Sequence, residues 1–284
     1  MSVEAEDLPA WAEPFAAADR LARAAGLRQI DRTWAWGGST GKGVTVAIVD
    51  SGVEGSHPWI EGRLVESVAV QVDKRGTAKV VPDEPVDLYG HGTACAGIVL
   101  DLAPDVDLIS VRVLNEDLRG KGTAFAEGLA WAIQRGVQVA NLSLSSKSEA
   151  LYPVFHELAD EAYFRNVALV SAANNVNVAS YPSLFSSVVS VAAHGEPDPR
   201  RLYYNPNPPV EFGAWGVDVP IAWKDGTETV ATGNSFAAPH VAGMAAVILA
   251  KHPGLTPFEL KAVLAAIADN PRPRARRRPA RAPA

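Results

Sequence analysis

Four polar residues, far apart in the sequence, have the side chains that acyl transfer to a serine requires. Such a reaction needs a nucleophile, a base within its reach, an acid that orients the base, and hydrogen-bond donors for the oxyanion. The candidates for these parts are Ser235, His91, Asp50 and Asn174. Asp50 and Asn174 follow apolar runs, His91 lies between two glycines, and Ser235 opens a long apolar stretch.

Each candidate also has an ordinary structural explanation. An aspartate after a strand is often satisfied by loop amides, and an asparagine there is often a turn residue. A serine before an apolar helix is more often a cap than a nucleophile. A histidine between glycines can be a loop residue or a metal ligand, although the sequence has neither an H-E-x-x-H spacing nor a cysteine cluster to support zinc. One residue by itself therefore decides nothing.

Short apolar runs alternate with helical stretches along the chain, which indicates an α/β domain with a mostly parallel sheet. The first run ends at Asp50, and α/β proteins place their sites at the carboxyl ends of parallel strands. Thr256, followed by Pro257 and Glu259, indicates a capped helix start. We expect strands over Val44–Val49, Leu108–Val113, Val137–Leu144, Val167–Ser171 and Val188–Ala192. We expect helices directly after His91 and over Phe15–Gly26, Thr123–Arg135, Leu151–Arg165, Ser235–His252 and Thr256–Ala268.

Three sequence blocks resemble those of the subtilisin-like serine proteases, or subtilases, and occur in the order of that family. The aspartate block is VAIVDSGVEGSHP, the histidine block is HGTACAG, and the serine block is GNSFAAPHVAG. The segments NLSL and SAAN fall where the family has its substrate-binding and oxyanion segments. The resemblance spans about residues 30–270. It implies a three-layer α/β subtilisin-like fold, with a mostly parallel central sheet flanked by helices.

The resemblance implies a role for each candidate. Ser235 attacks the peptide carbonyl, His91 takes its proton and passes it to the leaving amine, and Asp50 holds the imidazole in the right tautomer. Asn174 and the backbone N–H of Ser235 stabilise the oxyanion. The expected activity is that of a serine endopeptidase acting on a peptide or protein substrate. The expected substrate-binding residues are Ser143, Leu144, Ser145, Ala172, Ala173 and Ser180.

The substrate-binding segments depart from the family pattern by carrying extra side chains. Ser145 and Ser146 stand where two glycines are common, and Ala173 and Ser180 replace further glycines that usually open the pocket. We expect these side chains to narrow the pocket for the residue before the scissile bond, and so to favour small or otherwise restricted residues. The alternative is a slight backbone shift with no change of preference.

Further departures lie beside the nucleophile and after the histidine block. Asn234 and Phe236 flank Ser235 where the family usually has threonine and methionine, and we expect them to affect activity little. The stretch GIVLDLAPDVDLISVRVL lacks the longer loop that wraps a tight calcium site in many secreted relatives. We therefore expect no required cofactor and a weak dependence on calcium, unless acidic residues elsewhere form another site. Cys95, one turn past His91, is expected to be a small buried hydrophobic residue.

Composition limits the possible partners. The net charge of −6 argues against a dedicated nucleic-acid or anionic-membrane binder, and no apolar run reaches membrane-spanning length. The single cysteine excludes an intrachain disulfide. The acidic start MSVEAEDLPAWAEPF lacks the basic and apolar regions of a secretory signal, so we expect a cytoplasmic protein if this start is native. The oligomeric state stays open.

We expect three segments: an N-terminal extension over residues 1–19, one peptidase domain over residues 20–270, and a disordered tail rich in arginine and proline over residues 271–284. A narrow pocket without a calcium loop or a long propeptide favours a processing role, such as removing a leader from a peptide precursor. The alternatives are general intracellular protein turnover, a pseudoprotease that binds peptides without cleaving them, and an esterase or peptide ligase that uses the same acyl-enzyme.

Overall fold

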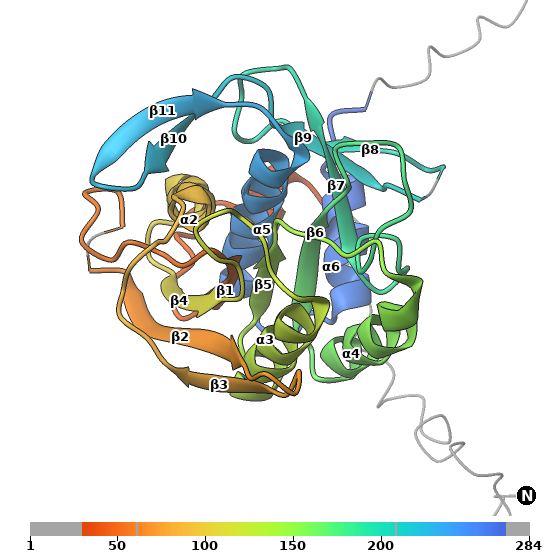
Figure 1. Ribbon diagram of the computed structural model, residues 1–284. Helices are drawn as coiled ribbons and strands as arrows, with labels where there is room; N and C mark the ends of the chain where they lie inside the picture. Colours follow the sequence, from red (N-terminus) through yellow and green to blue (C-terminus); the bar gives the residue numbers. More distant parts are fainter. Residues whose placement is uncertain (1–29, 61, 208, 271–284) are drawn as a thin grey trace, which may run out of the picture.

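The computed structural model describes residues 30–60, 62–207 and 209–270. The expected N-terminal extension, the helix expected over Phe15–Gly26 and the expected tail therefore lie outside the described residues. Within them, a central sheet lies between two layers of helices (Figure 1). This arrangement confirms the expected α/β class.

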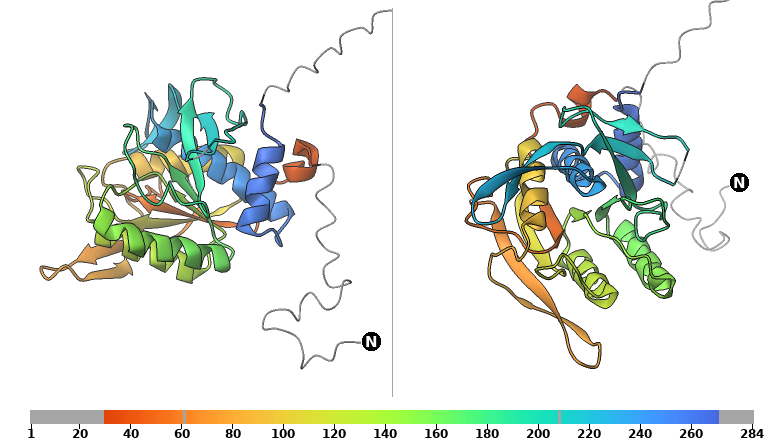
Figure 2. Two further views of the ribbon diagram at one scale, coloured as in Figure 1. Left: turned by 90° about the vertical axis from the view of Figure 1, so that its right-hand side faces the viewer. Right: turned by 45° about the horizontal axis from the view of Figure 1, so that its top comes forward.

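A nine-stranded, mostly parallel sheet forms the centre of the fold. Its strands are β1 (Thr45–Asp50), β2 (Leu64–Val72), β3 (Ala78–Pro82), β4 (Asp107–Arg112), β5 (Val139–Leu142), β6 (Ala168–Ala172), β7 (Val189–His194), β8 (Tyr203–Tyr204) and β9 (Phe212–Trp215). They follow the order β3-β2-β4-β1-β5-β6-β7-β9-β8. Neighbours from β2 to β9 pair in parallel, and only the outermost strands, β3 and β8, pair antiparallel in the described sheet. The β2–β3 hairpin projects at one edge (Figure 2).

Strand β1 shows why the first apolar run is continuous rather than alternating. Val46 and Ile48 pack into the core on one face of the sheet, whereas Ala47 and Val49 pack into the core on the other. Because both faces are covered, successive side chains all have to be apolar. The run ends at Asp50, at the carboxyl end of a strand near the middle of the sheet.

Helices cover both faces of the sheet (Figure 1). They are α1 (Arg32–Trp36), α2 (His91–Leu102), α3 (Gly122–Arg135), α4 (Tyr152–Phe164), α5 (Asn234–Lys251) and α6 (Pro257–Ala266), with a 3-10 turn, η4, at Glu149–Leu151. Residues of α2, α5 and α6 share one core, and residues of α3 and α4 share the other. Among the described residues, no helix combines the length and apolar character needed to cross a membrane.

The expected elements within the described residues are all present, and their ends differ from the expected ones by at most two residues. The capping box is confirmed: Thr256 Oγ1 accepts from the N–H of Glu259 at 3.3 Å, and the N–H of Thr256 donates to that glutamate at 2.8 Å. The antiparallel hairpin of β10 (Val219–Trp223) and β11 (Thr227–Ala231) was not expected. Strand β11 is mostly polar and exposed, so its sequence carries little strand signal.

Candidate active site

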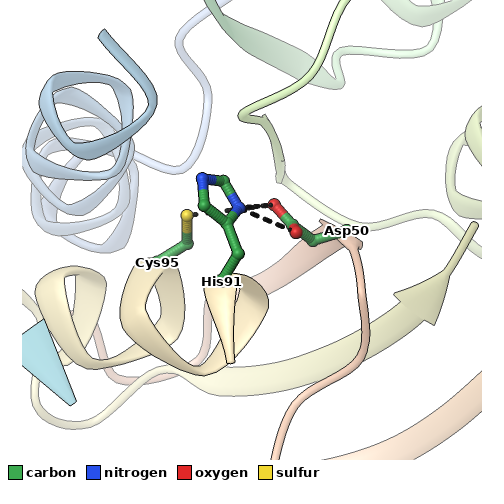
Figure 3. A group of neighbouring side chains, drawn as sticks. All are labelled: Asp50, His91 and Cys95. Atoms are coloured by element: carbon green, nitrogen blue, oxygen red, sulfur yellow. Dashed lines mark hydrogen bonds and ion pairs between the residues drawn. The ribbon is translucent and has the colours of Figure 1, made fainter. Parts of the chain in front are cut away.

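Asp50 and His91 meet at the carboxyl edge of the sheet. Asp50 ends β1 and has no exposed surface, and His91 is the first residue of α2. Nδ1 of His91 lies 2.8 Å from Oδ1 and 2.9 Å from Oδ2 of Asp50 (Figure 3). The N–H of Ser51 also donates to Oδ1, at 2.8 Å. When Nδ1–H donates to the carboxylate, the neutral ring keeps a free lone pair on Nε2 and can accept a proton there.

Two glycines beside His91 permit this close approach of β1 and α2. Gly90 has a φ of +116°, in the left-handed region that favours glycine. A Cβ atom added to Gly92 would collide with the carbonyl oxygen of Gly52, two residues past Asp50. The G-H-G sequence is therefore required by the backbone geometry that positions the histidine.

Ser235 is the second residue of α5 and lines a cavity of about 500 Å³ that His91 also lines. Its hydroxyl donates to the carbonyl oxygen of Ser143 at 3.2 Å. For Ser235 to act as the expected nucleophile, its hydroxyl has to turn from this carbonyl toward Nε2 of His91. Catalytic hydrogen bonds are often loose in the free enzyme and tighten when the substrate binds.

Pro239 connects the backbone of the serine to the segment after β5. Because proline has no N–H, the carbonyl of Ser235, four residues earlier, has no helical donor. The Ser143 hydroxyl donates to this carbonyl at 2.8 Å, and the Cys95 thiol lies 3.6 Å from it. The proline thus frees an acceptor that binds the helix start to the wall of the cavity.

Asn174 lies two residues beyond the end of β6. Its Nδ2 donates to the Ser145 hydroxyl at 3.4 Å, and its Oδ1 accepts from the N–H of Val176 at 3.0 Å. These bonds direct the amide N–H toward the segment whose Ser143 contacts Ser235. Its oxyanion role stays a prediction.

Two segments form most of the wall of the cavity beside Ser235. The first is the expected substrate-binding segment after β5, from Ser143 through Leu144 and Ser145 to Ser146. The second segment joins β4 to α3, and it was not predicted from the sequence as part of the site. The run Gly-Lys-Gly is the sequence feature that could have indicated a loop there. The cavity-lining residues of this segment and of the first turn of α3 are Leu114, Leu118, Arg119, Gly120, Lys121, Gly122 and Phe125.

The other expected substrate-binding residues lie outside the lining of this cavity, as far as the described residues show. Ala172 is buried at the end of β6, with Ala173 directly after it, and Ser180 is buried with 1% of its surface exposed. Tyr181, next to Ser180, forms an antiparallel bridge with Ser146. The bridge connects this segment to the cavity wall, and substrate contacts by these three residues stay a prediction.

Comparison with known proteins shows which family this chain belongs to. Residues 41–279 match the model of the subtilase family. The chain belongs to the subtilase family. This subtilase is 33% identical over 237 residues to subtilisin BL of Lederbergia lenta, covering 79% of this chain and 82% of that protein. It is 32% identical over 250 residues to subtilisin DY of Bacillus licheniformis, covering 82% of this chain and 86% of that protein.

Solved structures agree with the sequence comparison. A cold-adapted subtilisin-like serine proteinase has a TM-score of 0.66 at 30% identity, over 81% of this chain and 83% of that one. Sphericase has a TM-score of 0.67 at 26% identity, over 79% of this chain and 83% of that one. The subtilisin-like fold is thereby confirmed, and the protein is a serine endopeptidase, a hydrolase.

Asp87 is a residue of the site that the sequence did not reveal. Its carboxylate accepts five hydrogen bonds, from the Ser51 hydroxyl, from the N–H groups of Tyr89 and Gly90, and from both the N–H and the hydroxyl of Thr93. It thus satisfies donors at the start of α2, where His91 lies. Its position four residues before His91 is the sequence feature that could have indicated this role.

Opposing effects set the pKa of His91. Burial lowers it, because the charged ring loses water. The charge of Asp50, its hydrogen bond to the ring and the more distant charge of Asp87 raise it, and together they prevail. The pKa of His91 therefore lies above its ordinary value, and the charged form of the ring is stabilised.

This raised pKa predicts the acidic limit of activity. Only neutral His91 can act as a base, so kcat/KM rises with pH as the ring loses its proton, and the midpoint lies above the ordinary histidine pKa of about 6.5. Replacing Asp87 with asparagine removes a negative charge that raises this pKa. We expect Asp87→Asn to move the midpoint to lower pH, measured as kcat/KM against pH on a peptide substrate.

Asp101→Asn is the matched control, because Asp101 is exposed near the opposite end of the same helix. It should leave the midpoint where the parent has it. A midpoint that moves equally in both variants, or upward in Asp87→Asn, would contradict the assignment of Asp87 as a charge acting on His91.

Cys95 completes the group of potential metal ligands that Figure 3 shows. Ligand atoms of Asp50, His91 and Cys95 all lie within 4.8 Å of one another. Burial, and then the charge of Asp50, raise the pKa of the Cys95 thiol well above its ordinary value, so the thiol stays protonated. Because a metal ligand has to be a thiolate and Nδ1 already binds Asp50, the trio fits a hydrogen-bonded acid and base beside a buried thiol.

Proposed function

We propose that this subtilase is a processing endopeptidase that cuts peptide or protein precursors at restricted sites, through an acyl-enzyme on Ser235. The hydrogen bond between fully buried Asp50 and His91, beside the cavity that Ser235 lines, supports this chemistry. His91 takes the proton of Ser235 as the hydroxyl attacks the peptide carbonyl. The same proton then goes to the leaving amine, and water repeats the sequence to release the acyl group.

Charge develops at two places in this reaction, and the site has a partner for each. The imidazolium of His91 forms against the Asp50 carboxylate, from which water is excluded. The oxyanion forms near the start of α5, where the N–H of Ser235 and the amide of Asn174 are the proposed donors. The Asn174 side chain is held before substrate arrives by its bonds to the Ser145 hydroxyl and the N–H of Val176.

The observation that carries the proposed restriction is the position of the added serine side chains. Ser145 and Ser146 both line the cavity beside Ser235, and the Ser145 hydroxyl accepts from the amide of Asn174. The Ser145 side chain therefore lies between the cavity and the proposed oxyanion donor. We propose that the substrate side chain before the scissile bond enters this part of the cavity, where a large one has to compete with Ser145 for space.

We expect a peptide library to show a preference for alanine, serine or glycine immediately before the scissile bond. The Ser145→Gly variant should raise kcat/KM for peptides with phenylalanine at this position relative to peptides with alanine. A preference for phenylalanine or leucine in the parent would contradict the proposal. Ser148→Gly is the control, because Ser148 is exposed in the same loop and does not line the cavity; it should leave the preference unchanged.

A second measurement separates processing from general protein turnover. An unfolded protein substrate should be cut at a few sites into stable fragments that mass spectrometry can identify. Cleavage after many residue types, with progressive loss of all large fragments, would instead support turnover.

A further inference from the structure

The side chain of Asn234, directly before the nucleophile, joins three parts of the active site. Its Oδ1 accepts from the N–H of Ala193 in β7 at 2.8 Å. Its Nδ2 donates to the carbonyl oxygens of Ala173 and Asn174, at 3.1 and 3.2 Å. Its backbone N–H donates to Oδ1 of Asn175 at 2.9 Å. One residue therefore connects the start of α5 to the loop after β6 and to the neighbouring strand.

These contacts hold the backbone that carries the proposed oxyanion donor. Residues 173–175 follow the end of β6, and the N–H of Ala173 bonds to the carbonyl of Val191 in β7 at 2.8 Å. Without the Asn234 side chain, the carbonyls of Ala173 and Asn174 would each lose the N–H group that Asn234 donates to them. An oxyanion donor works only if it lies about 2.7–3.1 Å from the position of the developing charge, so movement of this loop should reduce catalysis.

The chemistry of the side chain explains why asparagine suits this position. A carboxamide has two N–H donors and one carbonyl acceptor, and here it uses both kinds of group. A threonine hydroxyl, the usual group at this position in the family, has a single hydrogen to donate. It cannot donate fully to two carbonyls while it accepts from Ala193. The departure at Asn234 is therefore part of the geometry of the site.

We propose that Asn234 is a positioning residue that fixes the Asn174 amide relative to Ser235. The proposal rests on the proposed oxyanion role of Asn174. It differs from the sequence expectation that Asn234 affects activity little. The described hydrogen bonds of the Asn234 side chain go to backbone groups of Ala173, Asn174 and Ala193. The proposed effect on catalysis therefore passes through Asn174.

A double-mutant cycle tests this coupling. We expect Asn234→Ala to lower kcat by about 10-fold with little change in KM, because misplacing a catalytic group weakens the transition state more than the bound substrate. In an Asn174→Ala background, the same change should cost less than about 2-fold, since the group to be positioned is gone. Equal losses of kcat in the two backgrounds would overturn the proposal.

The single variants separate the two ideas that the cycle combines. If Asn174→Ala retains the parent kcat, then the oxyanion role fails and the positioning role fails with it. If Asn174→Ala is slow but Asn234→Ala is not, then only the positioning role fails. Asn205→Ala, in an exposed loop outside these contacts, is the control and should match the parent.

Two more variants distinguish a loss of positioning from a general loss of structure. Asn234→Asp has the same shape but turns a carboxylate oxygen toward the two carbonyls, so kcat should fall at least as far as in Asn234→Ala. Asn234→Thr keeps one donor and should recover part of the loss. Thermal unfolding midpoints are measured for all variants, and a loss of kcat that follows the midpoint rather than the donor count would contradict positioning.

Discussion

Replacing Ser235 with alanine should lower kcat by about 10⁶-fold, the size of loss carried over from subtilisin itself. The hydroxyl is the only part of the side chain that changes, and no acyl-enzyme can form without it. The fold should persist, because the hydroxyl makes one described bond, to the Ser143 carbonyl, while the backbone carbonyl of Ser235 keeps its bond to the Ser143 hydroxyl. Hydrolysis of a chromogenic peptide, followed with active-site-titrated enzyme, measures the change.

A fluorophosphonate probe gives an independent result for the same variant. The folded parent should be labelled at Ser235, which peptide mass spectrometry can locate, and Ser235→Ala should not be labelled. Heat-denatured parent protein is the control for non-specific reaction. An unlabelled parent that still binds peptides would support a pseudoprotease, and a Ser235→Ala variant that cleaves at the parent rate would refute the nucleophile.

Replacing Asp50 with asparagine should lower kcat/KM by about 10⁴-fold. The carboxylate lies within 2.9 Å of Nδ1 of His91 through both oxygens. An amide N–H in its place would donate to Nδ1, which leaves the proton on Nε2 and so selects the wrong tautomer. The imidazolium would also lose its negative partner, the fully buried Asp50 carboxylate. Steady-state kinetics with the same chromogenic peptide measure the loss.

The control for this change is Asp107→Asn. Asp107 is exposed at the first residue of β4, at the opposite edge of the sheet from Asp50. It should keep the parent kcat/KM, and both variants should be compared by their thermal unfolding midpoints. A folded Asp50→Asn enzyme within 10-fold of the parent activity would rule out a catalytic role for the Asp50–His91 hydrogen bond.

Much of the fold follows from local sequence. The run VAIV is continuous because both faces of β1 are covered, and Thr256 with Glu259 caps α6 as the sequence indicates. The hairpin of β10 and β11 was missed because it is stabilised by contacts with other elements, among them α2, which is distant in the sequence. Val219 and Ile221 of β10 pack against α2 and α5, whereas β11 faces solvent. Local periodicity does not report such contacts.

The sequence by itself determined the identity and order of the candidate catalytic residues. Asp50, His91 and Ser235 each lie in a block whose glycines and apolar runs indicate where a strand ends or a helix begins. Such signals are local, because backbone conformation and the burial of neighbouring residues restrict which types are allowed. Together, these local signals were enough to predict the family and the reaction that it catalyses.

Only the tertiary structure decided how these residues are held. Asp87 accepts hydrogen bonds from five donors around the start of α2, and Asn234 connects the start of α5 to the loop of Asn174. The freed carbonyl of Ser235 finds its donor in Ser143, 92 residues away in the chain. These are hydrogen bonds between segments that meet only when the sheet forms, and polar residue types alone do not show which partners they will have.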